Sequence, residues 1–513
     1  MPSGKSTRLD YNTLRPHGKP ISSGDRYSSM SGPRSERLSE PELKFEPTFK
    51  HVEYSQPPEP QIEPESAPLP VNVVGAQRHA KDIKLLKQDN WLVRNGHFMT
   101  YIGLYLFTLM VLVRPYEIVP GLQFLASTTI YFAIVTIAIY IPSQIMTESN
   151  LTMLSTEVKA ILAMTAIALI TMPISRDHAM AWDTFSDTYI KAVAIFIVLV
   201  NVVRTRKRLM GLVTISLGIG VYLAIETTRR YMAGEFSIEG YRVAVTEVKG
   251  IFGNPNEMAM HFIMMIPIAI ALGAATKNKS LKLTYFSITG LFLAATLFTQ
   301  SRGGFLGLIS VACVLVWKLG RKSRLNVSLV SIVFGTIFLV IAPGNYGLRL
   351  LSIFIPSLDP VGSAGARREG LLTSLLVTAR NPWGIGIGNS PLFGARNLQT
   401  HNAYTQVSAE LGILGLIAYV VFIVSPFRKL GAIERTLYKA NELNWFYYVA
   451  IGLQASIVGY MVTSFFASVA YNWFIYYLIA YAVAFRRIYS LENGLTEDIK
   501  PVSFWDRPAV PST

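Results

Sequence analysis

The feature that most constrains the fold of this chain is a series of apolar runs, each close to the length of a membrane span. A transmembrane helix needs about 20 mostly apolar residues to cross the hydrocarbon core of a bilayer, and runs of this kind recur from residue 98 onwards. Of the 513 residues, 51% are hydrophobic and only 15% are charged, a combination that is rare in soluble domains. The chain is therefore expected to be an all-α, polytopic integral membrane protein.

About twelve transmembrane helices are predicted, and the shorter runs require tilting or polar ends. They lie at Phe98–Val113, Leu122–Ile141, Val158–Ile174, Ile190–Val203, Leu209–Glu226, Met258–Thr276, Leu283–Phe298, Phe305–Trp317, Val327–Ile341, Leu411–Val424, Phe446–Ser464 and Trp473–Phe485. A long segment, Pro343–Glu410, separates spans 9 and 10. Connections of this length are commonly functional or contain short helices. Arg367–Ala379 is expected to form one such helix, which Asn381 and Pro382 end.

Clusters of Lys and Arg predict which side of the membrane each connection faces. Five basic clusters fall on the same side when the spans are threaded in order: Arg204–Arg208, Lys277–Lys282, Arg321–Arg324, Phe427–Lys429 and Arg486–Arg487. The positive-inside rule assigns this side to the cytoplasm. Both termini are then cytoplasmic, and the long segment lies outside. Because cytoplasmic loops explain the net charge of +15, no nucleic-acid partner is expected.

The composition also divides the chain into regions. Residues 1–90 are rich in Ser, Pro, Arg and Glu without apolar periodicity, so we expect a disordered cytoplasmic tail rather than a signal peptide. A tail with no specific role is favoured over a docking segment. Residues 91–490 are the predicted transmembrane domain, with 343–410 as its external loop, and 491–513 are a C-terminal cytoplasmic tail. The single cysteine, Cys313, excludes a disulfide within one chain and is expected in the core.

The predicted external face contains arginines suited to binding an anion. Arg302 follows Ser301 at the end of a span and precedes two glycines, while Arg367 and Arg368 lie in the long segment. A guanidinium offers planar, bidentate donors that match phosphate oxygens. Because a charge near the bilayer is costly, a functional role for Arg302 is favoured over snorkelling to lipid head groups. For Arg229–Arg230, solvated surface is the better interpretation.

One histidine stands out in the same external region. Of the seven histidines, only His178 and His401 lie in predicted external segments. A neutral imidazole can accept a proton from a hydroxyl near pH 7. His401 lies close in sequence to Asn402, Tyr404 and Glu410, at the entry to a predicted helix. This polar cluster favours a binding or catalytic site over an ordinary surface histidine.

Several chemistries lack their motifs. The sequence contains no HExxH, no Asp-x-Asp pair, no GxxxxGK[ST] loop and no GxSxG elbow. GIGIGN (Gly384–Asn389) resembles a glycine-rich phosphate loop, but the strand-to-helix context of a dinucleotide fold is missing. It is expected to be a flexible loop that lets backbone approach a substrate. Metal-dependent hydrolysis and ATP-driven work are therefore not expected, and neither a metal site nor a cofactor is predicted.

Three segments together resemble the O-antigen ligase and O-antigen polymerase superfamily. They are SRGG at Ser301–Gly304, the block from Arg367 to NPWGIGIGN, and THNAYTQVSAELGILGL. GNPNEMA and the RPYE turn agree with this resemblance, which covers roughly residues 95–490. It implies a metal-independent, inverting glycosyltransferase that works at the external face of the bacterial inner membrane.

The resemblance also implies roles for individual residues. The basic residues of the family match Arg302 and Arg367, and its histidine in an H-N-x-x motif matches His401. The arginines would stabilise the negative charge that develops on a diphosphate leaving group. His401 would orient or deprotonate the acceptor hydroxyl. Substrate contacts are expected from Ser301, Arg368, Asn402, Tyr404 and Glu410.

The implied donor is a glycan on undecaprenyl diphosphate. A ligase would transfer it to lipid A core, a polymerase to another lipid-linked repeat, and an O-oligosaccharyltransferase to a protein hydroxyl; the shared motifs do not separate these three. The alternative from another class is a secondary transporter or flippase. Such a protein should show charged or broken helices near the bilayer midplane, often in repeated halves. No internal repeat is visible, and the polar residues concentrate in external segments, which favours the enzyme.

Overall fold

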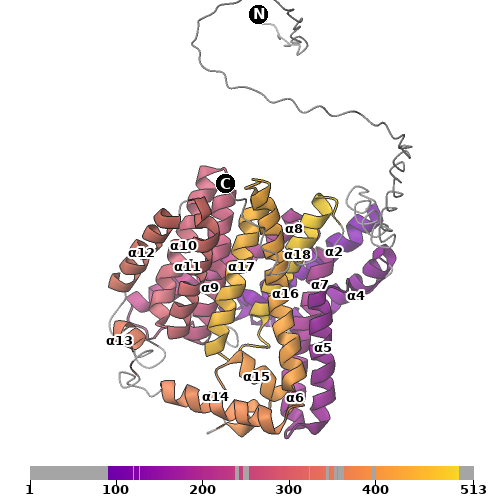
Figure 1. Cartoon of the computed structure of the whole chain (residues 1–513). Coiled ribbons are helices and arrows are strands. Elements are labelled where there is room, and N and C mark those ends of the chain that lie inside the picture. Colours follow the sequence, from indigo (N-terminus) through magenta and orange to yellow (C-terminus); the bar gives the residue numbers. More distant parts are fainter. Residues whose placement is uncertain are drawn as a thin grey trace, which may run out of the picture. The chain divides into compact units, whose positions relative to one another are not determined.

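The chain divides into two units, Met1–Ala67 and Pro68–Thr513, and the described residues belong to the second. The computed structural model describes residues 91–118, 121–125, 128–148, 150–236, 242–245, 253–322, 324–341, 346–351, 355, 363–394 and 400–495. The predicted N-terminal tail, and the C-terminal tail from residue 496, lie outside these residues. Figure 1 shows that the described part is built from helices.

Nine helical segments in the described part of the chain are long and apolar enough to cross a membrane. They contain α4 (Thr128–Glu148), α5 (Thr156–Thr171), α6 (His178–Asp183) with α7 (Ile190–Val202), α8 (Arg206–Met232), α9 (Pro255–Ala275), α10 (Lys279–Thr299), α11 (Arg302–Leu319), α16 (Gly412–Lys439) and α17 (Trp445–Thr463). Helices also stand at the other expected spans, namely α2 (Trp91–Leu112), α12 (Arg324–Ile341) and α18 (Trp473–Glu492). The polytopic all-α class is confirmed, whereas the count of twelve stays a prediction.

The third of these apolar segments begins earlier than the sequence indicates. His178 was expected in an external segment, but it is the first residue of α6, which continues through a π-helical turn, η3 (Thr184–Tyr189), into α7. The side chain of Asp177 caps this helix by accepting a hydrogen bond from the backbone N–H of Met180 at 3.0 Å. An aspartate at this position satisfies one of the free N–H groups of a helix start, so the helix extends to it.

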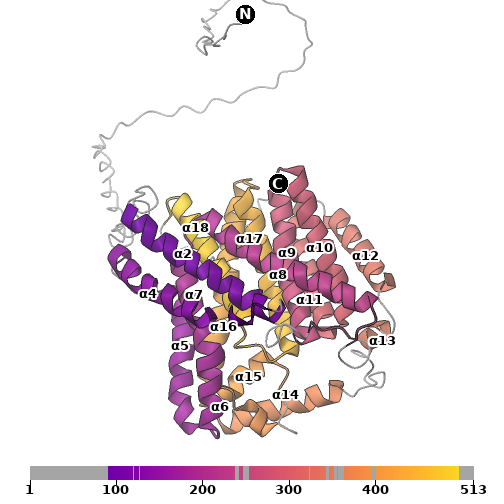
Figure 2. The ribbon, with the colours of Figure 1, turned by 180° about the vertical axis from the view of Figure 1, so that it is seen from behind.

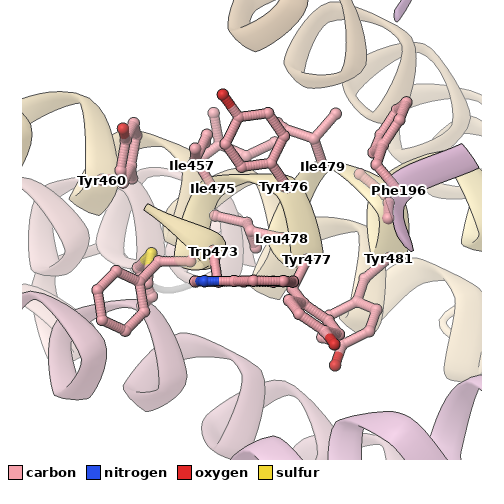
Figure 3. Packing of buried hydrophobic residues seen from close by; sticks show 14 of the residues in the cluster. Phe196, Ile457, Tyr460, Trp473, Ile475, Tyr476, Tyr477, Leu478, Ile479 and Tyr481 are labelled. Atoms are coloured by element: carbon pink, nitrogen blue, oxygen red, sulfur yellow. The ribbon is translucent and has the colours of Figure 1, made fainter. Parts of the chain in front are cut away.

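The core is centred on α18, whose residues from Trp473 to Leu491 are buried. A helix that is covered on every side lies inside the bundle. Its tyrosines bury their rings and bond their hydroxyl groups, as Tyr481 does with Ser216 at 2.8 Å. Figure 3 shows Tyr476 on one side of the helix and Tyr477 and Tyr481 on the other. The expectation of a buried cysteine is wrong, since Cys313 is exposed.

Ion pairs fasten the helices together at one end of the bundle. Three carboxylates, each at most 13% exposed, pair with two basic side chains apiece: Glu148 with Arg204 and Arg487, Glu157 with Lys429 and Arg486, and Glu434 with Lys318 and Arg321. Residues of four of the five basic clusters meet here. This agrees with their prediction on a common side, and the assignment of that side to the cytoplasm stays a prediction. We call this region the basic end.

The opposite end carries the shorter helices α13 (Tyr346–Leu351), α14 (Ser363–Arg380) and α15 (Ala403–Glu410). Figures 1 and 2 show all three at the same end of the long helices. The helix expected at Arg367–Ala379 is confirmed as α14, which ends before Asn381 and Pro382 as predicted. The long connection is therefore a structured cap over its described residues. We call this region the polar end.

Candidate active site

His401 lies in a tight turn directly before α15. Its backbone φ is +53°, which is uncommon for a residue other than glycine. The next residue, Asn402, caps α15: its side-chain oxygen accepts hydrogen bonds from the N–H groups of Tyr404 at 2.9 Å and Thr405 at 3.1 Å. The cap holds the turn in place, so the position of the half-buried imidazole is set by the helix that follows it. Asn402 is itself buried and acts within this turn.

Helix α14 packs against the same turn. A Cβ atom added at Gly370 would lie 3.4 Å from the carbonyl oxygen of Thr400. Arg367 precedes Gly370 by three residues and therefore shares its helix face. Burial, followed by the positive charge of Arg367, lowers the pKa of His401 below its ordinary value. The structure thus brings Arg367 and His401 together, while Arg368 is exposed on α14.

The segment that follows α17 contacts the His401 turn from another side. The hydroxyl groups of Thr400 and Ser468 are 3.3 Å apart. The hydroxyl of Tyr404 donates to the carbonyl of Met461 at 3.0 Å and accepts from Ser464 at 3.4 Å. Tyr404 was predicted to contact substrate, and these bonds show that its hydroxyl anchors α15 to α17. We call residues 464–468 the bridging segment.

Arg302 reaches the same segment from α11, of which it is the first residue. A Cβ atom added at Gly303 would lie 2.9 Å from the Cβ of Phe466 in the bridging segment. The start of α11 therefore packs two residues away from Ser468, which contacts the His401 turn. Arg302 is only 7% exposed. The helix start that contains Arg302 and the turn that contains His401 thus both contact the bridging segment, and Arg367 lies near His401.

Ser301 holds the beginning of α11. Its hydroxyl accepts a hydrogen bond from the N–H of Gly304 at 3.1 Å and donates to the side-chain oxygen of Asn256 at 2.8 Å. Its carbonyl accepts from the hydroxyl of Tyr346 at 3.2 Å. Ser301 was predicted to contact substrate, but its hydroxyl is engaged within the protein, where it positions Arg302.

Arg242 is another buried arginine at the polar end, and the sequence, which places it among the external arginines, does not predict its burial. Arg242 is 4% exposed and donates to the side-chain oxygen of Asn256 at 2.8 Å and to the carbonyl of Thr299 at 3.2 Å. It therefore shares Asn256 with Ser301. The sequence does point to this region through the GNPNEMA motif, which contains Asn256. No pattern around Arg242 itself predicts its burial.

Glu410 lies at the far end of α15 and is fully buried. The seven-residue rise from Ala403 corresponds to about 10 Å along the helix axis, so Glu410 does not join the group around His401. One carboxyl oxygen accepts a hydrogen bond from the N–H of Ser390 at 3.3 Å, and Tyr471 faces the carboxyl group. Burial raises the pKa of Glu410. Its contacts support the loop above it, and the substrate contact predicted for it stays a prediction.

That loop is GIGIGN, and the expectation that it is flexible and open to substrate is wrong. Its glycines have positive φ angles and pack against the protein: a Cβ atom at Gly386 would lie 2.3 Å from the Cβ of Ser175, and one at Gly388 would lie 2.2 Å from the hydroxyl oxygen of Thr184. Asn389 bonds both the N–H and the carbonyl of Asp177. A side chain at either position would collide with these neighbours, so glycine is needed there. The loop therefore packs against the start of α6 and against η3.

The geometry fits recognition of an anion next to a proton acceptor. Arg302 and His401 lie at the starts of α11 and α15, and the positive end of a helix dipole favours a negative ligand there. Arg367 adds a guanidinium beside the imidazole. Within the described residues, no group of three His, Cys, Asp or Glu side chains is arranged to hold a metal ion. The side chains present can thus bind phosphate oxygens and accept a proton.

The match to a known family falls on this part of the chain. Residues 287–420 match the family model described as O-antigen ligase. This part of the chain is similar to the O-antigen ligase family. This range runs from α10 into α16 and includes Arg302, Arg367 and His401, so the resemblance predicted from the motifs is confirmed. A search of curated proteins found no match to the chain.

Proposed function

We propose that this protein transfers a glycan from undecaprenyl diphosphate to a sugar hydroxyl at the external face of the inner membrane. The observation that carries the proposal is that the start of α11, which contains Arg302, and the His401 turn, with Arg367 near it, contact the same bridging segment. Two guanidinium groups suit a diphosphate, and a half-buried imidazole suits a hydroxyl that must lose a proton. The donor, a lipid-linked glycan of the O-antigen class, contains the diphosphate. The acceptor sugar provides the hydroxyl.

The arginines act on the leaving group. In the transfer, the bond between the anomeric carbon and the diphosphate oxygen breaks while the acceptor oxygen attacks the opposite face, which inverts the anomeric configuration. Negative charge grows on the diphosphate as the bond breaks. Arg302 and Arg367 are placed to stabilise that charge, and preorganised donors of this kind act more strongly in the transition state than in the ground state. The reaction proposed here needs no metal ion.

His401 accepts the proton of the acceptor hydroxyl. A general base must be unprotonated before the reaction, and the lowered pKa of His401 keeps the imidazole neutral at pH 7. Burial and Arg367, which lower this pKa, also favour loss of the proton after transfer. Because the imidazolium would lie next to Arg367 in a half-buried setting, it is unfavourable and returns its proton to water. The same geometry therefore prepares the base and resets it.

A direct test uses the purified full-length protein with a glycan on undecaprenyl diphosphate and three acceptors in parallel. The acceptors are lipid A core, a second lipid-linked repeat, and a peptide with serine and threonine hydroxyls. Mass spectrometry follows the glycosylated acceptor and the released undecaprenyl diphosphate. Transfer to lipid A core in the presence of EDTA is the expected result. Transfer only to a lipid-linked repeat assigns a polymerase, and transfer only to the peptide assigns an O-oligosaccharyltransferase.

The transporter alternative predicts a different result in the same system. With the protein in sealed vesicles, a flippase moves the intact lipid-linked donor across the bilayer without releasing undecaprenyl diphosphate. Donor that changes leaflet but stays intact with every acceptor contradicts the proposed transfer. In cells, deletion of the gene should leave full-length lipid-linked polymer unattached. Accumulation of single repeats would indicate a polymerase instead.

A further inference from the structure

A cavity of about 620 Å³ lies outside the group around His401. Its walls come from α2, α4 and α7, with the start of α18 closing one side. This volume falls within the range of small-molecule sites, which are about 300–1,000 Å³. The wall residue Ile130 is 54% exposed, so the cavity reaches the outer surface of the helices, where membrane lipids lie.

The cavity extends lengthwise into the bundle. On α2 it reaches Leu104, eight residues before the end of the helix, and on α7 it reaches Val198, eight residues after its start. Eight residues of helix correspond to about 12 Å. Its inner end is closed by tight packing of α2 on α4, where a Cβ atom at Gly103 would lie 2.3 Å from the hydroxyl oxygen of Thr136. The inner walls are mainly aliphatic.

The polar lining residues gather at the polar end of these helices. Arg114 and Lys191 bring two guanidinium or ammonium groups to the mouth, where Lys191 pairs with Asp187 at 2.5 Å. Arg114 has a backbone φ of +48°, a conformation that is costly for a residue other than glycine and is concentrated at functional sites. The hydroxyl of Thr129, also on the lining, is buried without a hydrogen-bond partner among the described residues.

The mouth of the cavity is connected to the candidate active site. Asn472 lines the mouth and follows Ser468 by four residues, which span at most about 14 Å. Ser468 contacts Thr400, next to His401. A ligand with its apolar end between α2, α4 and α7 can therefore extend its head group past Asn472 toward the bridging segment.

We infer that this cavity binds the prenyl chain of the lipid-linked donor, with the phosphate-proximal end of the chain at Arg114 and Thr129. The inference rests on the proposed function for the identity of the lipid. Three properties carry it: aliphatic inner walls, cationic side chains at the mouth, and a short path from the mouth to the His401 turn. An aliphatic chain is stabilised by leaving water for such walls. The chain-binding cavity thus holds the donor while the arginines bind its diphosphate.

The test measures binding rather than transfer. Full-length protein in nanodiscs is photolabelled with undecaprenyl monophosphate that carries a diazirine in the chain, and the labelled peptides are mapped by mass spectrometry. Labels are expected in α2, α4 and α7. Ala133→Trp fills the cavity from α4 and should reduce labelling about tenfold, because the indole occupies volume that the chain would fill. Ala194→Trp tests the same point from α7. The matched control is Ala138→Trp, an exposed position on α4 outside the cavity.

Competition identifies the source of the ligand. Unlabelled undecaprenyl monophosphate should remove the label, whereas phosphatidylglycerol and inorganic pyrophosphate should leave it. Equal competition by phosphatidylglycerol would show a structural lipid site and overturn the inference, as would labelling that both cavity-filling variants leave unchanged. Labelling of the cavity by a protein that transfers no glycan would contradict the proposed function and keep the chain-binding cavity. Glycan transfer without labelling of the cavity would overturn the chain-binding inference and keep the proposed function.

Discussion

The two ends of the helix bundle treat buried charge differently. At the basic end, each of three buried carboxylates contacts two cationic side chains, so opposite charges meet directly. At the polar end, the carboxyl groups of Glu257 and Glu410 accept hydrogen bonds from neutral donors, Asn472 and the N–H of Ser390. Arg242 donates to a carbonyl and an amide oxygen.

The difference separates two uses of arginine. Contact pairs in a buried setting fix neighbouring helices, because removing one partner leaves an uncompensated charge at a cost of about 3–5 kcal/mol. A guanidinium at the start of a helix, such as that of Arg302, adds to the positive field of the helix dipole, which a phosphate can use. Composition alone counts the two kinds of arginine together in the net charge of +15. The comparison therefore predicts that substitutions at the basic end reduce stability and that substitutions at the polar end reduce transfer.

The largest effect is expected from His401. Replacing it with Ala or Gln should slow transfer by about 10²–10⁴, the usual contribution of a general base, with donor binding retained. In the natural protein, the rate should fall as pH falls through the pKa of the imidazole. Burial and Arg367 hold that pKa below its ordinary value of about 6.5, so the midpoint of this fall should lie below pH 6.5.

The Gln variant distinguishes the base from a merely structural side chain. Glutamine keeps a donor and an acceptor for the turn before α15 but cannot take up the proton. Transfer and donor binding are measured separately for both variants, with membrane levels of the protein as a control. A Gln variant that keeps most of its transfer rate removes the base role and leaves His401 as a support for the turn.

The next largest effect should come from the arginines near the bridging segment. Arg302→Lys and Arg367→Lys keep the charge but lose the planar, bidentate donors. Loss of one preorganised donor to a developing oxyanion costs about 10²–10³ in rate, and we expect a transfer defect of that order with normal thermal unfolding. Arg368→Lys is the matched control, since Arg368 is exposed on the same helix. A defect confined to the Arg368 variant would move the role by one position.

A smaller effect, about 10²-fold, is expected when α14 is displaced from the His401 turn, because a shift of about 1 Å can cost that much in rate. Gly370→Val adds a branched side chain where even a Cβ atom would lie 3.4 Å from Thr400. Gly365→Val places the same residue in α14 at a position with open space around it. If both variants transfer equally well, the packing of α14 on the turn does not position Arg367.

These residues also show how far the sequence alone leads. Apolar runs and basic clusters predicted the helices and their common basic side, because span length and charge are local properties of the chain. The motifs also led to Arg302, Arg367 and His401. Their approach to one another could not be predicted, since it depends on the bridging segment, a connection between α17 and α18 with no motif of its own. The burial of Arg242 could not be predicted for the same reason, because it depends on contacts with Asn256 and Thr299.

At the basic end, a substitution should reduce stability and leave transfer unchanged. Glu148→Gln leaves Arg204 and Arg487 without their shared carboxylate and should destabilise the fold by about 3–5 kcal/mol. Thermal unfolding in detergent reports the loss, and transfer per folded molecule should be unchanged. Glu492→Gln is the control, because its pair with Arg206 is exposed at the same end and should contribute little. A stable Glu148 variant with impaired transfer would show that this end acts on the reaction.

The smallest effect is expected from an arginine at the end of α8, in a segment predicted to be external. Arg229 is 55% exposed and pairs with Glu226 and Glu235. An exposed ion pair in water contributes little, because solvent screens it and both side chains lose freedom. Arg229→Ala should therefore change neither thermal unfolding nor the rate of transfer, although it removes a positive charge that Arg302→Lys keeps. Salt titration of transfer sharpens the point. If Arg229→Ala slows transfer at low salt and added salt removes the difference, the external arginines attract the anionic donor through a shared long-range field. If the rate is unchanged at every salt concentration, only arginines that contact the donor contribute to the rate of transfer.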